Sequence, residues 1–147
     1  MIVCDTCTWI EVLIGSELSR SFPPYLQDRR NLIVPTLGQA EMRKWALRER
    51  DENFADRVIA ATRVAAQIEP LTENIALAAA DHCANDGLSI GDAIICATAR
   101  FHNAALVTPD AHFAALPGVR YLEKKGDKFV EVTVVKTRPK KNMADEK

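Results

Sequence analysis

Short apolar runs alternate with helical patterns along most of the chain. The runs predict strands at Met1 to Asp5, Asn31 to Val34, Gln67 to Glu69, Ala104 to Val107 and Val119 to Leu122. Between most of them, apolar residues recur at the three- and four-residue spacing of amphipathic helices. Parallel strands need a crossover connection, which is usually a helix. We therefore predict an α/β domain with a central, mostly parallel sheet flanked by helices.

Capping residues and glycines locate the predicted helices. The first passes through Trp9 and Leu13 and ends at Gly15, and residues 21–30 follow as a connection or a broken helix. The others are expected at about 36–50, opened by a capping box at Thr36 to Gln39; at about 53–66; at 73–86, between a Thr72 cap and a Gly87 stop; and at about 92–102, opened by Asp92 after a loop over residues 88–91.

The end of the chain has a different pattern. Apolar and polar residues alternate from Phe129 to Val135, after a Gly126-Asp127 turn, which predicts an added edge strand or hairpin. Residues 137–147 are nearly all polar, and we expect them to fray. We therefore divide the chain into a domain over residues 1–125 and a C-terminal extension over residues 126–147, with an edge strand and a polar tail.

Length and composition are those of one ordinary globular domain, with 147 residues, 48% hydrophobic and 27% charged. No apolar stretch approaches the roughly 18 residues of a membrane span, and the N-terminus lacks the features of a signal peptide. We therefore expect a cytoplasmic protein without membrane contact. The net charge of −1 does not indicate a nucleic-acid partner, but one short stretch concentrates Arg43, Lys44, Arg48, Arg50, Arg57 and Arg63. A local basic face is compatible with a nearly neutral protein.

Four acidic residues lie beside apolar segments, where acids are unusual: Asp5, Glu41, Asp92 and Asp110. Asp5 closes the first apolar strand, and Asp110 closely follows the strand that ends at Val107. The carboxyl ends of parallel strands, and the helix starts that follow them, lie along one rim of a sheet. The pattern therefore predicts that these carboxylates assemble into one site.

Each acid also has a purely structural explanation. Asp92 can act as a helix cap or as a first-turn acid beside the helix dipole, Asp110 can cap a short turn, and Asp5 can be a cap as well. Glu41 is harder to explain in this way. It lies one turn from both Leu37 and Trp45, on the helix stripe that we expect to face the core, and a buried carboxylate needs a partner.

Assembled carboxylates require a counter-charge. Two such charges about 4 Å apart repel by about 4 kcal/mol at an effective dielectric constant of about 20. A hard divalent cation removes this repulsion, and Mg²⁺ or Mn²⁺ prefers carboxylate and water oxygens. Such an ion polarises a phosphoryl oxygen and lowers the pKa of a bound water. The four acids therefore indicate phosphoester hydrolysis with water as the nucleophile.

Cys4 and Cys7 have the C-x-x-C spacing of some zinc and redox sites. Zinc needs two further ligands, and the remaining cysteines, Cys83 and Cys96, have no partnering motif. Cys4 lies inside an apolar run, so we expect a small core residue rather than a redox centre. The histidines have no ligand spacing among themselves and are expected to be surface or helix-end residues: His82, His102 and His112.

Four segments, in this order and spacing, resemble the PIN-domain ribonucleases, and in particular the VapC toxins of bacterial toxin–antitoxin pairs. They are Ile-Val-Cys-Asp-Thr-Cys-Thr-Trp-Ile at 2–10, Pro-Thr-Leu-Gly-Gln-Ala-Glu at 35–41, Leu-Ser-Ile-Gly-Asp-Ala-Ile-Ile-Cys-Ala-Thr-Ala at 88–99 and Leu-Val-Thr-Pro-Asp-Ala-His-Phe at 106–113. The resemblance extends from Met1 to about Leu122. It implies a three-layer α/β fold of the PIN type.

The resemblance also implies a site and its partners. By it, the family's acidic metal-binding quartet corresponds to Asp5, Glu41, Asp92 and Asp110, and a hydroxyl residue near the site corresponds to Thr108. It implies Mg²⁺ or Mn²⁺ as cofactor, RNA as substrate, a homodimer, and a cognate antitoxin that points a basic side chain into the acidic site. Cys7 departs from the pattern, because relatives commonly carry a small hydroxyl or amide residue there.

These observations favour a metal-dependent endoribonuclease that acts as the toxin of a toxin–antitoxin pair. One alternative is an aspartyl-phosphate phosphatase with Asp5 as nucleophile, but that class usually has a second Asp two residues later, where this chain has Cys7. Another alternative is a non-catalytic module that binds RNA or protein, with a partner's Arg or Lys among the acids. Retention of all four acids favours the nuclease.

Overall fold

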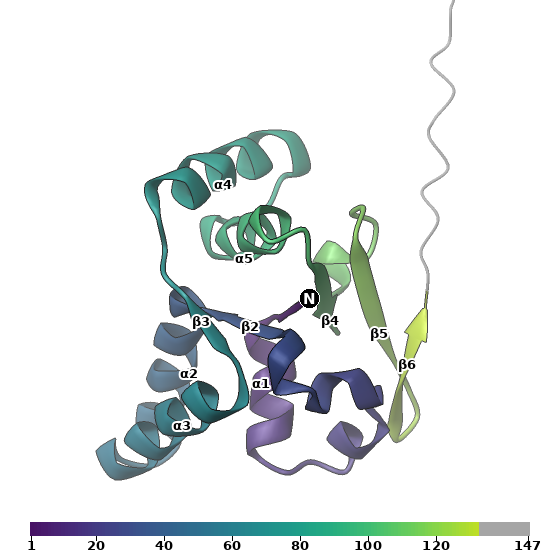
Figure 1. The fold of residues 1–147 in the computed structure, drawn as a ribbon. Coiled ribbons are helices and arrows are strands. Elements are labelled where there is room, and N and C mark those ends of the chain that lie inside the picture. Colours follow the sequence, from purple (N-terminus) through teal and green to yellow (C-terminus); the bar gives the residue numbers. More distant parts are fainter. Residues whose placement is uncertain (133–147) are drawn as a thin grey trace, which may run out of the picture.

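Six strands form a single sheet in the computed structural model, which describes residues 1–132 (Figure 1). Neighbouring strands are paired in the order β3 (Gln67–Glu69), β2 (Leu32–Pro35), β1 (Ile2–Cys4), β4 (Ala105–Thr108), β5 (Val119–Lys125) and β6 (Lys128–Val132). The first five are parallel, and β6 pairs antiparallel with β5. The predicted strands and the mostly parallel sheet are confirmed.

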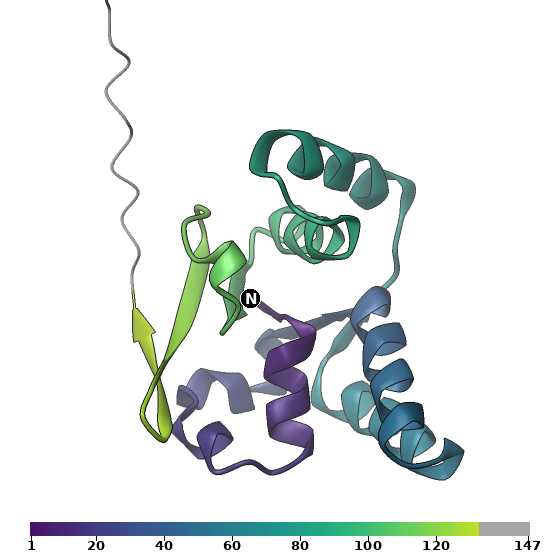
Figure 2. The same cartoon turned by 180° about the vertical axis from the view of Figure 1, so that it is seen from behind.

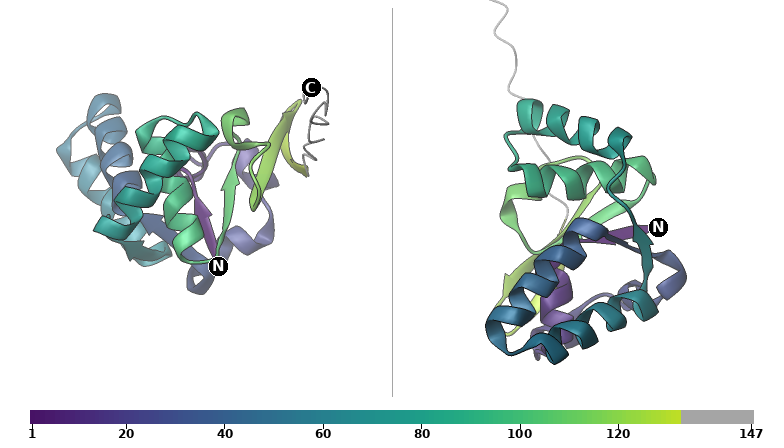
Figure 3. Two further views of the ribbon diagram at one scale, coloured as in Figure 1. Left: turned by 90° about the horizontal axis from the view of Figure 1, so that it is seen from above. Right: turned by 90° about the vertical axis from the view of Figure 1, so that its left-hand side faces the viewer.

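Helices cover both faces of this sheet and complete three layers (right panel of Figure 3). One face carries α1 (Thr6–Leu13), α2 (Thr36–Glu49) and α3 (Glu52–Ala65), and the other carries α4 (Glu73–Asp86) and α5 (Ile90–Phe101). Short 3-10 helices occur at η1 (Leu18–Ser21), η2 (Pro24–Gln27), η3 (Arg29–Asn31) and η4 (Ala111–Phe113). The three-layer α/β prediction is confirmed. Within residues 1–132, no helix combines the length and apolar character needed to cross a membrane.

The two halves of the core follow from the alternation of side chains along each strand. Cys4 and Val34 belong to the cluster beneath α1, α2 and α3, whereas Val3 and Ile33 belong to the cluster beneath α4 and α5. All four side chains are almost completely buried. Parallel strands covered on both faces have continuous apolar runs, which explains why these strands were recognisable in the sequence.

The predicted start of α2 at residue 36 is confirmed, but its capping box is wrong, and the predicted start of α5 is wrong by two residues. Thr36 does not open a capping box, because Pro35 occupies the N-cap position of α2 and the Thr36 hydroxyl accepts a hydrogen bond from the Leu71 amide at 3.1 Å. Asp92 does not open α5, which begins at Ile90 after a Ser89 cap. The Asp92 carboxylate is therefore not needed as a helix cap. The Thr72 cap and the left-handed Gly87 stop of α4 are confirmed.

The C-terminal hairpin belongs to the same sheet. Its second strand, β6, contacts the end of η1. The Phe129 amide donates to the Ser21 hydroxyl at 2.7 Å, and the centres of the Phe129 and Phe22 rings lie 5.2 Å apart. The predicted strand is thus present, although its residues 133–135 and the polar tail lie outside the described residues. The division of the chain at residue 125 stays a prediction.

Candidate active site

The candidate site lies where the order of the strands reverses. The chain leaves β1 towards β2 and β3, and it later returns to the opposite side of β1 with β4. The segments that follow β1 and β4 therefore diverge at the carboxyl ends of these two strands (Figure 2). A crevice at such a point is the usual place for ligands in open α/β sheets. Asp5 follows β1, and Asp110 closely follows β4.

Asp5 is the buried acid of the site, with an exposed fraction of 4%. It is the N-cap of α1, so one carboxylate oxygen, Oδ1, accepts from the Thr8 amide at 3.0 Å and the Thr8 hydroxyl at 2.8 Å. Its other oxygen, Oδ2, accepts from the Thr108 hydroxyl at 2.6 Å. Both oxygens are thus fixed in direction by neighbouring donors.

Burial raises the pKa of the Asp5 carboxyl above its ordinary value. The hydrogen bonds from Thr108 and Thr8 oppose this shift, and the negative charge of Asp110 adds to it. The raised pKa means that the protein provides less stabilisation for the Asp5 anion than water does. A bound cation would supply what is missing.

Thr108 connects two of the acids. Its side chain is fully buried, donates to Asp5 and accepts from the Asp110 amide at 2.9 Å. One hydroxyl therefore fixes the relative positions of the residues that end β1 and β4. This places Thr108 beside the acids, and a positioning function for it is consistent with the geometry.

Glu41 borders the crevice from α2 and is half-buried rather than part of the core. The core-facing residues of α2 are Gly38, Met42 and Ala46, so the expected stripe through Leu37, Glu41 and Trp45 was wrong by one residue. The Thr6 hydroxyl donates a short hydrogen bond to Glu41 Oε2. On the other side, a Cβ at Gly91 would lie 3.5 Å from Glu41 Oε1, an ordinary contact distance, so the start of α5 lies close to this carboxylate.

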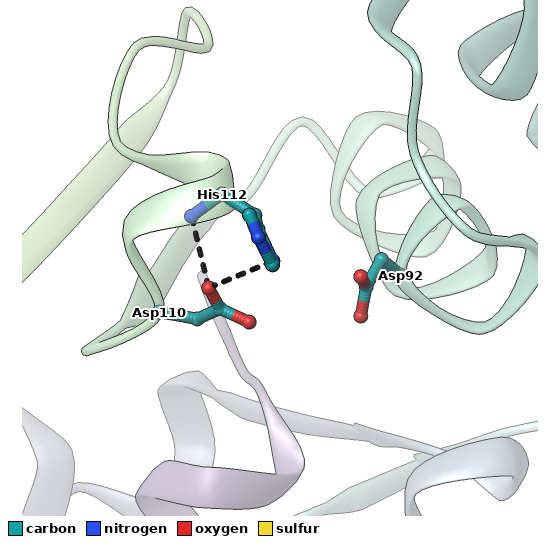
Figure 4. Close-up of side chains that lie close together, drawn as sticks. All are labelled: Asp92, Asp110 and His112. Carbon is teal, nitrogen blue, oxygen red and sulfur yellow. Dashed lines mark hydrogen bonds and ion pairs between the residues drawn. The ribbon is translucent and has the colours of Figure 1, made fainter.

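Asp92 and Asp110 face each other across the crevice, with His112 beside them (Figure 4). One ligand atom from each of these three residues lies within 4.8 Å of the others. Asp110 caps η4 by accepting from the His112 amide at 2.9 Å, and the His112 ring nitrogen Nδ1 lies 3.3 Å from the same oxygen. The sequence did not single out His112 as a site residue. Its Asp-x-His spacing to Asp110 is the signal that was available.

All four predicted acids line one cleft of about 340 Å³. Their combined field is visible at Cys7, whose pKa rises to about 11 because its thiol is partly desolvated and because the four carboxylates oppose a thiolate. Cys7 is exposed at the mouth of this cleft, whereas Cys4 is buried, which confirms the expectation that Cys4 is a small core residue. The remaining lining residues are Thr6, Ile10, Lys44, Trp45, Arg48 and Ile95.

This donor set fits a hard divalent cation. All its donors are carboxylate oxygens. Asp5 is buried and has a raised pKa, and Asp92 and Asp110 lie close enough to bind the same ion. Within residues 1–132, no ion pair joins a lysine or arginine to any of the four acids. Among residues 1–132, only Asp110 has a basic side chain as partner, His112 at 3.3 Å, so the repulsion among the other three acids is not relieved by an ion pair.

Comparisons with known proteins agree with the fold. The family model of the PIN domain matches residues 2–119. The similar solved structures include a toxin–antitoxin complex from Klebsiella pneumoniae, with 23% identity, a TM-score of 0.67 and coverage of 81% of this chain and 95% of that one. A search of curated proteins found no significant match.

Two further structures cover nearly the whole domain. VapBC2 from Rickettsia felis, bound to a DNA fragment from its promoter, has 16% identity and a TM-score of 0.64, with coverage of 88% of this chain and 100% of that one. VapC20 from Mycobacterium tuberculosis, described as a toxin that cleaves the Sarcin-Ricin loop, has 19% identity and a TM-score of 0.63, with coverage of 91% and 100%. At identities this low, the structural similarity establishes a common fold and nothing further.

Proposed function

The chain belongs to the PIN-domain family, and from this premise we propose that it is a metal-dependent endoribonuclease that acts as the toxin of a toxin–antitoxin pair. One observation carries the proposal. Four carboxylates from four separate segments, Asp5, Glu41, Asp92 and Asp110, line the same cleft, and within residues 1–132 none of them forms an ion pair with a lysine or arginine. Such an arrangement is costly unless a cation occupies it.

Each residue has a separate task in this proposal. Asp5, Asp92 and Asp110 hold Mg²⁺ or Mn²⁺, and Thr108 keeps the Asp5 and Asp110 segments in register through its two hydrogen bonds. When bound, the ion would polarise a phosphoryl oxygen and lower the pKa of a coordinated water. Glu41, oriented by Thr6, positions that water or holds a second ion. The cleaved bond is an RNA phosphodiester, and the substrate is exposed single-stranded RNA.

The geometry disfavours a phosphoaspartate mechanism. A nucleophilic carboxylate needs an oxygen that is free to approach the phosphoryl group. Asp5 is 4% exposed, and its two oxygens already accept three hydrogen bonds from Thr8 and Thr108. We therefore assign Asp5 to holding a cation rather than to attacking phosphorus.

An antitoxin partner is part of the same proposal. Structures with this fold include complexes described as toxin–antitoxin pairs, and a partner's basic side chain in the acidic cleft would relieve carboxylate repulsion and displace the metal ion. We further propose that the protein is a homodimer and acts in the cytoplasm, where its RNA substrate occurs.

Cleavage of a structured RNA by the purified protein tests the nuclease. We expect cleavage with Mg²⁺ or Mn²⁺, none with EDTA, and none by Asp5→Asn or Asp92→Asn. Asp81→Asn is the matched control, since Asp81 is an exposed acid on α4 outside the cleft and should leave cleavage unchanged. Equal cleavage by all variants would identify a contaminating nuclease. Absence of both cleavage and calorimetric metal binding would instead favour the non-catalytic module.

A further inference from the structure

One wall of the acidic cleft carries positive side chains. Lys44 and Arg48 line the cleft together with Glu41, and they follow it on α2 by three and seven residues. Positions at this spacing share one face of a helix. Trp45 lies on the same stretch and also borders the cleft. We call Lys44, Trp45 and Arg48 the α2 wall.

The two cations of the α2 wall are available to a ligand. Lys44 is exposed and forms no ion pair with any residue of the described range 1–132. Arg48 contacts its chain neighbour Glu49 at 3.2 Å, but the side chains are 72% and 47% exposed. An ion pair this exposed contributes little, so Arg48 can exchange it for a phosphate.

Nearby basic residues are more firmly engaged. The Arg43 guanidinium is held between α2 and α3 by Asp56 at 2.7 Å and lies 3.9 Å from Glu52. Arg50 and Arg57 lie over the ring of Phe54, at 5.2 and 6.0 Å from its centre. The basic stretch seen in the sequence therefore divides into residues that pack against α3, residues that line the cleft, and the exposed Arg63.

Trp45 supplies an aromatic surface between the two cations. It is half-buried, and its ring packs against Phe54 at 5.9 Å with the planes inclined by 59°. This contact fixes the side chain while part of it still borders the cleft. Phosphate-binding cations combined with a rigid aromatic side chain are the elements of a site for single-stranded nucleic acid.

We propose that the α2 wall holds single-stranded RNA beside the scissile phosphate. Lys44 and Arg48 bind backbone phosphates, and Trp45 stacks with a base. The helix rise places the Cα atoms of Lys44 and Arg48 about 4.5 and 10.5 Å beyond that of Glu41 along the axis, which suits contacts with successive nucleotides beside the reacting phosphate. This inference rests on the proposed nuclease function and assigns its substrate track.

Equilibrium binding of a short, fluorescently labelled single-stranded RNA tests the track directly. Anisotropy is measured in EDTA over a series of salt concentrations, for the wild type, Lys44→Ala and Arg48→Ala. Each variant should bind more weakly and reduce the slope of log affinity against log salt by about 0.7, the value for one phosphate contact on a single strand.

The matched controls are Lys124→Ala and Arg63→Ala. These cations are exposed, lie outside the cleft, and form no ion pair with any residue between 1 and 132. They should retain wild-type affinity and slope. Equal losses in the controls and in the α2-wall variants would show general charge attraction and would overturn the proposal.

Trp45 has an independent readout. Trp9, the other tryptophan, is only 7% exposed, so quenching of the exposed tryptophan signal by unlabelled RNA reports on Trp45. Trp45→Leu keeps apolar bulk against Phe54 but should bind RNA about fivefold more weakly or worse, the lower range for loss of one base stack. Trp45→Phe should restore most of the affinity. Unchanged fluorescence and binding would remove Trp45 from the track.

Cleavage measured in parallel separates this inference from the nuclease proposal. Lys44→Ala and Arg48→Ala should raise KM with little change in kcat or metal affinity. RNA binding that depends on them, without any metal-dependent cleavage, would support the track and overturn the nuclease. If cleavage requires Asp92, but Lys44→Ala and Arg48→Ala cleave RNA as the Lys124→Ala and Arg63→Ala controls do, the nuclease is supported and the track is overturned.

Discussion

Asp5 lines the cleft and is held from behind by hydrogen bonds from Thr8 and Thr108; this group, which we call the floor, is built differently from the α2 wall. The floor residues are buried and joined by short hydrogen bonds, whereas Lys44 and Arg48 are exposed and carry at most a weak ion pair. A buried anion without a cation reduces the stability of the fold, while exposed cations have little effect on it. In the proposed nuclease, the floor therefore serves metal binding at a cost in stability, and the wall serves adjustable binding of RNA.

Asp5→Asn tests the floor most severely. Cleavage should fall by more than about 100-fold, beyond the 10- to 100-fold typical of a residue that only supports a ligand. The melting temperature of the metal-free protein should stay the same or rise, because the amide keeps the capping acceptor for Thr8 and removes a poorly solvated charge. A large fall in melting temperature, absent in Asp81→Asn, would make Asp5 mainly a structural cap.

Thr108→Val removes the hydroxyl that links Asp5 to the Asp110 amide. Metal affinity, measured by calorimetry, should fall about 10- to 100-fold. Stability should fall by about 1–3 kcal/mol in denaturant unfolding, because the part-buried Asp110 amide loses its acceptor. The control is Thr98→Val, at a buried threonine whose hydroxyl donates to the Ile94 carbonyl away from the cleft. Equal metal affinity in the two variants would contradict a positioning function.

The raised pKa of Asp5 predicts an unusual dependence of stability on pH. The folded metal-free protein binds the Asp5 proton more tightly than the unfolded chain does, where the pKa is about 3.9. The contribution of Asp5 is therefore lost as pH rises through the folded pKa, and it returns as pH falls. The melting temperature of the wild type minus that of Asp5→Asn should decrease as the pH rises from about 3.9 through the pKa of the folded protein. A difference independent of pH would contradict the assignment.

Saturating Mg²⁺ should reverse that trend. The metal binds the ionised carboxylate, so a proton competes with it and the stabilisation by Mg²⁺ should increase as pH rises. The same pair of proteins, melted with and without Mg²⁺, measures this effect. A constant stabilisation by Mg²⁺, equal in Asp5→Asn, would place the ion elsewhere.

Gly91→Ala should have the smallest effect. The new methyl group would lie 3.5 Å from Glu41 Oε1, an ordinary contact that crowds this carboxylate only slightly. Activity should fall no more than a few-fold, while the gain in helix propensity raises stability by up to about 1 kcal/mol. Kinetics and thermal unfolding measure the two effects. A complete loss of cleavage would show that the spacing between α5 and Glu41 is far less tolerant than the structure indicates.

Sequence patterns predicted the acids at the strand ends better than the other residues of the cleft. Asp5 and Asp110 were located because apolar runs identify parallel strands, whose carboxyl ends must share a rim. Glu41 was placed on the wrong stripe, since helix periodicity does not fix the face of α2 to within one residue. His112, Lys44 and Arg48 were not assigned to the site, because exposed side chains leave no hydrophobic pattern and their positions depend on how separate elements pack.

The central claim is that four carboxylates form one divalent-cation site. Calorimetric titration of Mn²⁺ into the wild type, Asp5→Asn, Glu41→Gln, Asp92→Asn, Asp110→Asn and the Asp81→Asn control tests it most directly. We expect saturable Mn²⁺ binding that is weakened by Asp5→Asn, Asp92→Asn and Asp110→Asn and unchanged in the control, while loss of a second binding process in Glu41→Gln alone would place a second ion at Glu41. Binding that is absent in the wild type, or unaffected by all four substitutions, would contradict it.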